Sequence, residues 1–165
     1  RSIGEQPFQG VNLRLAQAGG RRREGGRIAV QRGLHPEGPC RLTVVLPAYR
    51  EADRIAVNVQ RVRTELAARM AGAPGDLEII VVDDGSDDGT AGAAAAGGAD
   101  LVIRLGRNTG KGAAVRAGVE AASGRTIAFT DADLAYAPAQ MADLLALVED
   151  GYDMVVGSRR HTDTP

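Results

Sequence analysis

From residue 41 onward, short β-branched apolar runs alternate with longer segments whose apolar residues recur at helical spacing. This alternation predicts buried strands separated by amphipathic helices. The predicted strands are residues 42–46, 77–82, 101–105, 126–129 and 153–156, and the predicted helices are 53–71, a short Ala-rich one between 88 and 97, 111–122 and 138–149. Strands and helices in this order build βαβ units. We expect an α/β domain with three αβα layers around a mostly parallel central sheet.

Polar side chains follow four of the predicted strands. They lie at Tyr49 and Glu51, at residues 83–86, at 131–133 and at 158–159. The carboxyl ends of parallel strands share one edge of a sheet, and open α/β sheets bind ligands at that edge. We therefore expect these loops to form one site.

Asp131-Ala132-Asp133 places two carboxylates one residue apart, directly after a predicted strand. Two such groups can bind one hard cation, Mg²⁺ or Mn²⁺, which takes its remaining ligands from water and substrate phosphates. An acidic turn that caps the next helix explains the same triplet. Both interpretations stay open on the triplet alone.

Two glycine-containing loops allow similar pairs of interpretations. In residues 83–90, a carboxylate can accept a hydrogen bond from the imide N–H of a nucleotide base, or the loop can serve only as a turn with a helix cap. In residues 108–112, backbone N–H groups and Lys111 can meet a phosphate, or the lysine can be solvated. Lys111 is the one lysine among twenty basic residues. Neither a P-loop nor a G-x-G-x-x-G fingerprint is present.

Composition excludes several classes of protein. Aromatic residues make up 3% of the chain and tryptophan is absent, which disfavours a stacking surface for single-stranded nucleic acid. The net charge of −1 gives no general attraction to nucleic acid. Cys40 is the one cysteine, so a disulfide and a structural zinc site are not expected. Residues 1–40 carry seven arginines against three glutamates, a charge of +4, and are predicted to be a flexible basic arm.

In order, five motifs resemble family 2 glycosyltransferases, and within them the polyprenyl (dolichyl) phosphate sugar synthases. They are V-L-P-A-Y-R-E at 45–51, V-V-D-D-G-S-D-D-G-T at 81–90, N-T-G-K-G at 108–112, D-A-D-L at 131–134 and V-G-S-R at 156–159. The resemblance implies a Rossmann-like GT-A fold in residues 41–165. It also implies inverting hexose transfer from a UDP- or GDP-sugar to a polyprenyl phosphate, with Mg²⁺ or Mn²⁺. The full-length protein would work at the cytoplasmic face of a membrane, with peripheral membrane contact.

The resemblance also assigns roles by motif position. It implies contacts to the base and ribose from Pro47, Tyr49 and Glu51, with Val82 flanking the base and Asp84 reading it. It implies that a second group of residues contacts the metal and the diphosphate: Asp131, Ala132, Asp133 and Arg159. Within this group the resemblance implies that Asp131 and Asp133 bind the metal and that Asp133 and Arg159 act in catalysis. His161, near the end of the chain, is interpreted as a surface residue.

Two departures from the family pattern carry expectations. Ala135 stands where the mannosyl branch often has glutamine, which favours the glucosyl branch and UDP-glucose. Family members continue past the position of Pro165 with acceptor-facing segments, so we expect this chain to bind donor nucleotide without transferring sugar. The alternative function is a catalytically incomplete nucleotide-binding or regulatory module. A sugar nucleotidyltransferase would need a Gly- and Arg-rich loop after the first strand, and an NAD-dependent oxidoreductase would need the missing glycine fingerprint.

Overall fold

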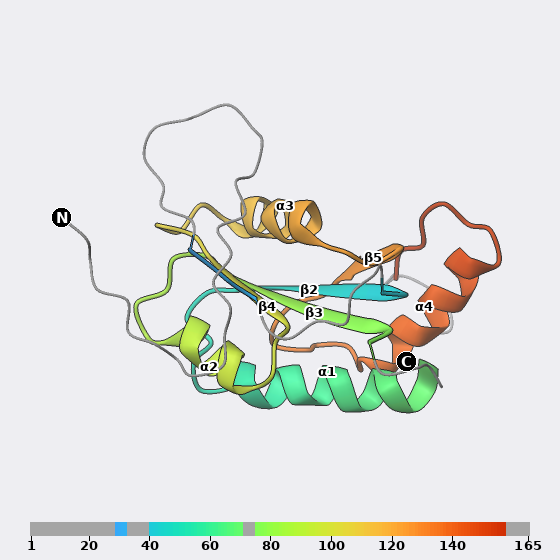
Figure 1. The fold of residues 1–165 in the computed structure, drawn as a ribbon, viewed down its shortest axis with the longest axis horizontal. Helices are drawn as coiled ribbons and strands as arrows, with labels where there is room; N and C mark the ends of the chain where they lie inside the picture. Colours follow the sequence, from blue (N-terminus) through green and yellow to red (C-terminus); the bar gives the residue numbers. More distant parts are fainter. Residues whose placement is uncertain (1–28, 33–39, 71–74, 158–165) are drawn as a thin grey trace.

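The computed structural model describes residues 29–32, 40–70 and 75–157 of the 165-residue chain. Its strands are β1 (Ala29–Arg32), β2 (Leu42–Ala48), β3 (Leu77–Asp83), β4 (Leu101–Arg104) and β5 (Thr126–Phe129). Its helices are α1 (Ile55–Met70), α2 (Thr90–Ala96), α3 (Lys111–Ala121) and α4 (Ala139–Glu149). From β2 onward, a helix follows each strand, as the alternating sequence pattern predicts (Figure 1).

The five strands form one sheet in the order β1-β4-β3-β2-β5. The four strands from β4 to β5 are parallel, and β1 pairs antiparallel with β4. The predicted α/β fold with a mostly parallel sheet is therefore confirmed. The chain builds the sheet outward from β2 to β3 and β4, and α3 then carries it back so that β5 forms on the other side of β2. This reversal creates a switch point between β2 and β5, where such sheets bind ligands.

Helices cover both faces of the sheet, with α1, α2 and α4 on one face and α3 on the other (Figure 1). Successive side chains of a strand point to opposite faces, so each central strand feeds two cores. Val44 and Leu46 of β2 belong to the core beneath α1, whereas Val45 belongs to the core beneath α3. Both β2 and β3 are buried almost throughout, which explains their continuous apolar sequences.

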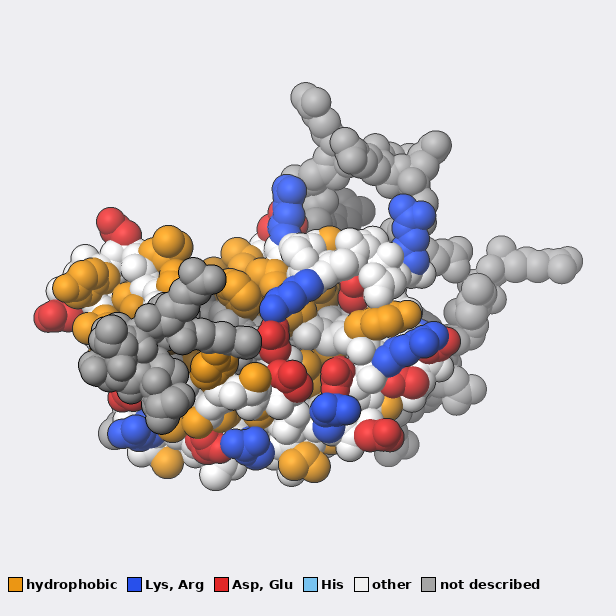
Figure 2. Space-filling model, turned by 180° about the vertical axis from the view of Figure 1, so that it is seen from behind, with side chains coloured by type: hydrophobic (Ala, Val, Ile, Leu, Met, Phe, Trp, Pro, Cys, Tyr) orange, Lys and Arg blue, Asp and Glu red, His pale blue; other side chains and the backbone are white. Residues whose placement is uncertain are grey.

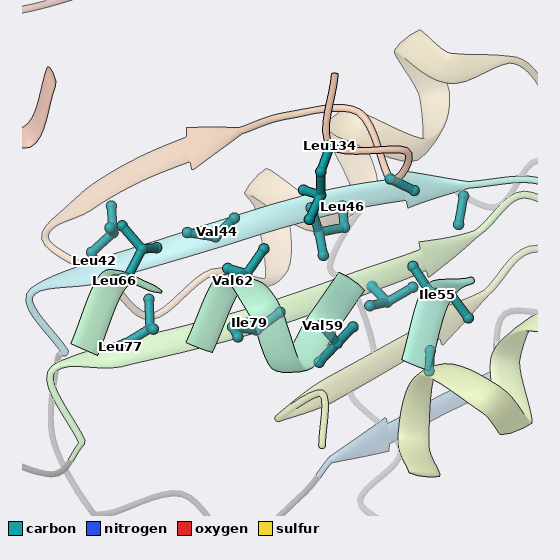
Figure 3. Packing of buried hydrophobic residues seen from close by; sticks show 14 of the residues in the cluster. Leu42, Val44, Leu46, Ile55, Val59, Val62, Leu66, Leu77, Ile79 and Leu134 are labelled. Atoms are coloured by element: carbon teal, nitrogen blue, oxygen red, sulfur yellow. The ribbon is translucent and has the colours of Figure 1, made fainter. Parts of the chain in front are cut away.

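The apolar stripe of α1 packs along β2 and β3. Its buried positions recur every three or four residues: Ile55, Asn58, Val59, Val62, Leu66 and Met70. Figure 3 shows Leu66 lying near Leu42 at the start of β2, while Ile55 lies toward the opposite end. The helix thus runs antiparallel to the strand and returns the chain to the amino end of the sheet, where β3 begins.

Helix α3 lies close to the sheet because of a glycine. A Cβ at Gly118 would collide with a methyl group of Val45 and would stand 3.2 Å from a methyl carbon of Val82. Any larger residue at this position would have to push the helix or the valines apart. Gly118 therefore determines how near α3, and the loop that begins it, can approach the strands.

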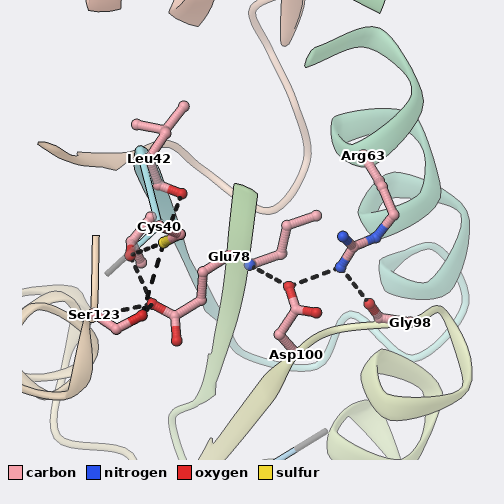
Figure 4. A network of polar contacts seen from close by, with 9 residues as sticks. Cys40, Leu42, Arg63, Glu78, Gly98, Asp100 and Ser123 are labelled. Atoms are coloured by element: carbon pink, nitrogen blue, oxygen red, sulfur yellow. Dashed lines mark hydrogen bonds and ion pairs between the residues drawn. The ribbon is translucent and has the colours of Figure 1, made fainter. Parts of the chain in front are cut away.

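A polar network ties the amino ends of the strands together (Figure 4). The buried Glu78 of β3 accepts hydrogen bonds from the Thr43 hydroxyl at 2.6 Å and from the Ser123 N–H at 2.8 Å. Asp100, before β4, accepts from the Ile79 N–H and from Arg63 of α1, both at 2.7 Å. This network lies at the end of the sheet opposite the polar loops.

Two segments differ from the sequence prediction. The strand predicted at residues 153–156 is wrong, because that stretch pairs with no described strand and leaves Met154 78% and Val156 73% exposed. A β-branched sequence cannot supply the neighbouring backbone that a strand needs for its N–H and C=O groups. Conversely, residues 29–32, which lie inside the predicted arm, form β1 and pair with the outer edge of β4. The Gly- and Arg-rich stretch at 19–26 and His161 lie outside the described residues.

Candidate active site

The loops after β2, β3, β4 and β5 surround a pocket of about 330 Å³ at the carboxyl edge of the sheet. The pocket opens at the switch point, since β2 and β5 both end beside it. Its lining residues are Pro47, Ala48, Tyr49, Glu51, Asp84, Asn108, Gly110, Lys111, Ala114, Asp131, Ala132 and Asp133. The polar loops that the structure describes therefore meet at one edge of the sheet, around this pocket.

The Asp131–Asp133 turn lines the pocket with all three of its residues. Ala132 and the following Leu134 are buried, at 4% and 7% exposure, which attaches the turn to the core. The turn is closed by a hydrogen bond of 3.0 Å from the Leu134 N–H to the Asp131 carbonyl, and Leu134 adopts a φ of 52°. That left-handed conformation is rare for a bulky residue and indicates a turn that its surroundings determine.

Asn58 of α1 anchors this turn. Its side-chain N–H donates to the Ala132 carbonyl at 2.8 Å, and the contact is buried. The backbone between the two aspartates is thereby attached to a helix that is itself packed on the sheet. Sequence reasoning missed Asn58, although it is a polar residue in an otherwise apolar helical stripe, and a buried amide needs a partner.

Lys111, the first residue of α3, forms an ion pair with Asp131. Both side chains are about half exposed, 56% and 46%. Among the described residues that line the pocket, Lys111 is the one cationic side chain. The predicted phosphate contact, Lys111, and one predicted metal ligand, Asp131, are therefore each other's partner.

Asp84 holds the loop that precedes α3. One carboxylate oxygen accepts from the Thr109 N–H and hydroxyl, both at 2.8 Å, and the other accepts from the Gly110 N–H at 2.7 Å. A carboxylate has about four lone-pair positions, so one remains for a ligand. The sequence suggested the backbone N–H groups of residues 108–112 for a phosphate, and two of these, from Thr109 and Gly110, donate to Asp84 instead.

The loop after β2 is held by the loop after β3. The Arg50 N–H donates to the Ser86 hydroxyl and the Glu51 N–H donates to the Thr90 hydroxyl, both at 2.9 Å. Asp88 accepts from the Thr90 hydroxyl at 2.6 Å and from the Ala52 N–H at 3.3 Å. The Thr90 hydroxyl bond, together with the backbone bonds, holds the pKa of Asp88 below its ordinary value. The loop that carries Tyr49 and Glu51 is therefore held in place by the loop after β3.

Gly85 lets the loops after β3 and β4 touch. It has a φ of 78°, and a Cβ there would collide with the backbone of Arg107. Only glycine combines this conformation with so close an approach. The loop after β3 therefore contacts both neighbours: Ser86, Asp88 and Thr90 hold the loop after β2, and Asp84 holds the loop after β4.

The structure brings together eight of the ten residues predicted to form the site: Pro47, Tyr49, Glu51, Asp84, Lys111, Asp131, Ala132 and Asp133. Val82 is fully buried and packs in the core beneath α3, behind the pocket wall. Arg159 lies outside the described residues. The pocket lining also includes Asn108 and Ala114, which sequence reasoning did not assign to it.

Charged side chains of both signs lie side by side across the middle of the face shown in Figure 2. Near the pocket, Glu51 pairs with Arg54 at 2.9 Å, and Arg50 pairs with Asp87 at 3.0 Å. The Arg50 guanidinium also stands 5.4 Å from the ring centre of Tyr49. The carboxylate of Asp133, by contrast, accepts from the Ala135 N–H at 3.2 Å, within its own turn.

Residues 43–165 match the family model described as Glycosyl transferase family 2. This match covers most of the chain, and the protein belongs to that family. The predicted family is confirmed, and with it the GT-A fold, a transferase fold built on a parallel α/β sheet.

Curated relatives are transferases that act on a lipid phosphate, as their names state. The chain is 33% identical over 126 residues to an undecaprenyl-phosphate 4-deoxy-4-formamido-L-arabinose transferase of Yersinia enterocolitica, covering 73% of this chain and 37% of that protein. It is 36% identical over 125 residues to the enzyme of the same name from Aeromonas hydrophila, with the same two coverages. The chain thus spans little more than a third of the length of these relatives.

Two solved structures are similar. One is a mannosyltransferase from Pyrobaculum calidifontis in complex with GDP-Man and Mn²⁺, with a TM-score of 0.57 and 26% identity over 73% of this chain and 35% of that chain. The other is a mycobacterial protein with a TM-score of 0.55 and 29% identity, covering 68% of this chain and 38% of that one. No helix in the described part of this chain is long and apolar enough to cross a membrane.

Proposed function

We propose that this chain carries the donor site of an inverting glycosyltransferase that uses a nucleoside-diphosphate sugar, a divalent cation and a polyprenyl phosphate acceptor. The observation that carries the proposal is the pocket at the switch point, where Asp131 and Asp133 face the same cavity as Tyr49 and Asp84. A cation site and a base site in one pocket suit a nucleoside diphosphate. A lipid-phosphate acceptor would bring the site next to a membrane surface.

The donor set of the pocket fits Mg²⁺ or Mn²⁺. Two carboxylates supply hard oxygen ligands, and such ions commonly take only one or two from the protein and the others from water and substrate phosphates. Within the described residues, no group of three or more His, Cys, Asp or Glu side chains gathers as a metal cluster. Asp131 and Asp133 would therefore hold the ion together with the diphosphate, and the mannosyltransferase solved with GDP-Man and Mn²⁺ supports this pairing.

The protein's own contribution is to position the donor. The cation, when bound, would offset charge on the leaving nucleoside diphosphate. Pro47, Tyr49 and Glu51 would hold the base and ribose, with Asp84 accepting from the base through its remaining lone pair. Arg159 would contact the diphosphate. A polyprenyl phosphate is already an anion near neutral pH, so the acceptor needs no strong protein base.

The sugar is proposed to be a hexose, with glucose from UDP-glucose favoured over mannose because Ala135 replaces the glutamine typical of the mannosyl branch. The curated relatives are named for a modified L-arabinose, so a UDP-linked pentose belongs in the same comparison. Transfer of radiolabelled sugar from UDP-glucose, GDP-mannose and a UDP-pentose to a polyprenyl phosphate would rank the donors of the whole protein.

The binding test uses calorimetry of UDP with Mn²⁺ and with EDTA. We expect Mn²⁺ to raise the affinity for UDP at least tenfold, and Asp133→Asn to remove most of that increase, because the ion then loses one of its two carboxylates. Asp150→Asn, which removes an exposed carboxylate beyond α4, should behave as the wild type. Equal affinity for UDP with Mn²⁺ and with EDTA would reject the proposed metal site.

A further inference from the structure

The ion pair between Lys111 and Asp131 joins the pocket's one described lining cation to one of the two proposed metal ligands. The other acidic groups of the lining have different partners. Glu51 pairs with Arg54, and Asp84 accepts from backbone N–H groups. The lysine ammonium group thus lies at one of the two carboxylates that are proposed to bind the metal.

Helix stability does not explain a lysine at this position. A cation in the first turn faces the positive end of the helix dipole, which is unfavourable. The one arginine of α3, Arg116, pairs with Glu120 four residues further along the same helix, at 2.8 Å. Lys111 instead reaches across to the loop after β5. Its interaction is therefore with the site rather than with its own helix.

We propose that Lys111 is an internal cation that occupies Asp131 and competes with the divalent ion until a nucleoside diphosphate draws the ammonium group away. This inference rests on the proposed function, since it concerns the same metal and donor. Metal alone must displace Lys111 from Asp131 and then repel it. Metal together with a diphosphate gives the ammonium group a new anionic partner. The two ligands therefore bind with positive coupling, each raising the affinity for the other.

The pair has the properties that such an exchange needs. Both side chains are about half exposed, so separating them costs little free energy. The lysine stem is flexible and its ammonium group is a compact charge that can move between partners. The N–H groups of Thr109 and Gly110 are already donated to Asp84. Lys111, the one cationic side chain of the described pocket lining, is then placed to meet a phosphate.

Lys111→Gln tests the exchange, because it removes the charge and keeps most of the side-chain length. Mn²⁺ affinity is measured without nucleotide by electron paramagnetic resonance of free Mn²⁺, and UDP affinity is measured calorimetrically at saturating Mn²⁺. We expect Lys111→Gln to bind Mn²⁺ alone about three- to fivefold more tightly than the wild type, the factor that loss of an exposed pair allows. The same variant should bind UDP more weakly at saturating Mn²⁺.

Two controls separate this effect from general charge. Arg116→Gln removes a cation from the exposed side of the same helix, outside the pocket lining, and should leave both affinities unchanged. Lys111→Arg keeps the charge and should keep Mn²⁺ affinity near the wild-type value. If Mn²⁺ raises UDP affinity but Lys111→Gln binds Mn²⁺ alone no more tightly than the wild type, the exchange is refuted and the proposed function stands. If Mn²⁺ does not raise the UDP affinity of the wild type, both fail.

Discussion

At the scale of single residues, the pocket depends both on side chains that line it and on side chains that hold its loops in place. Asp84 attaches the loop before α3 through Thr109 and Gly110 and retains one lone pair toward the pocket. Asn58 does not line the pocket at all, yet its bond to the Ala132 carbonyl orients the two aspartates beside it. Asp84 thus combines positioning with recognition, whereas Asn58 serves only in positioning.

Asp84→Ala should weaken UDP binding by roughly tenfold or more. A hydrogen bond from a base imide to a charged acceptor contributes about 1.5–3 kcal/mol, and the loop that carries Lys111 also loses its anchor. Calorimetry with UDP and with inorganic pyrophosphate separates the two effects. We expect a larger loss for UDP than for pyrophosphate. Equal losses would show that Asp84 only holds the loop and does not read the base.

At the scale of elements, the parts of the rim are joined through the loop after β3. It accepts the β2 loop through Ser86 and Thr90 and reaches the β4 loop through Asp84. Helix α3 then fixes the distance of the β4 loop from the sheet, because Gly118 allows the helix to lie directly on Val45 and Val82. The site is therefore assembled by contacts between loops as much as by the strands below them.

Gly118→Ala should destabilise the protein by about 1–3 kcal/mol, since the new methyl group must displace packed valines. Gly112→Ala is the matched control in the same helix, because a Cβ there meets nothing within 4 Å. It should be neutral or stabilising by up to about 1 kcal/mol, as alanine favours helices over glycine. Urea unfolding of both variants measures the difference. Equal stabilities would show that α3 can move away from the sheet without cost.

At the scale of the whole molecule, the two ends of the parallel sheet have separate tasks. The carboxyl end carries the pocket, and the amino end carries polar contacts that hold helices to strands. Arg41, before β2, donates to both carboxylate oxygens of Glu149 in α4 at 2.6 Å and to the Met70 carbonyl of α1 at 3.1 Å. One side chain thereby ties the ends of two helices to the sheet.

Arg41→Ala should lower the free energy of unfolding by about 1 kcal/mol, near the upper end for partly exposed pairs, and leave UDP affinity unchanged. The hydrogen bonds from Arg41 hold the pKa of Glu149 below its ordinary value of 4.5. A carboxyl group whose pKa is lower in the folded than in the unfolded protein stabilises the fold at pH values above the unfolded pKa. This stabilisation is lost as the pH falls through the folded pKa. Between pH 7 and pH 3, the melting temperature of Arg41→Ala should therefore fall less than that of the wild type. An equal fall in melting temperature, or a changed UDP affinity, would contradict the separation of the two ends of the sheet.

Sequence periodicity determined the order and kind of the elements from β2 to α4. Their apolar spacing is a local property, and a parallel arrangement follows from alternating strands and helices. The parallel arrangement also predicts most of the site, because loops that follow parallel strands lie at the same edge of the sheet. Pro47, Tyr49, Asp84 and Asp133 could thus be expected near one another from the chain alone.

Only the tertiary structure decided which groups bind one another. Residues 153–156 form no strand despite their β-branched sequence, whereas residues 29–32 pair with the edge of β4, because pairing depends on the backbone that the fold brings alongside, which no local pattern encodes. Likewise, the partners Asn58–Ala132 and Lys111–Asp131 lie far apart in the sequence and meet through packing. Periodicity specifies the face on which a residue lies, whereas the partner of a polar atom depends on the distances that the assembled sheet and helices impose.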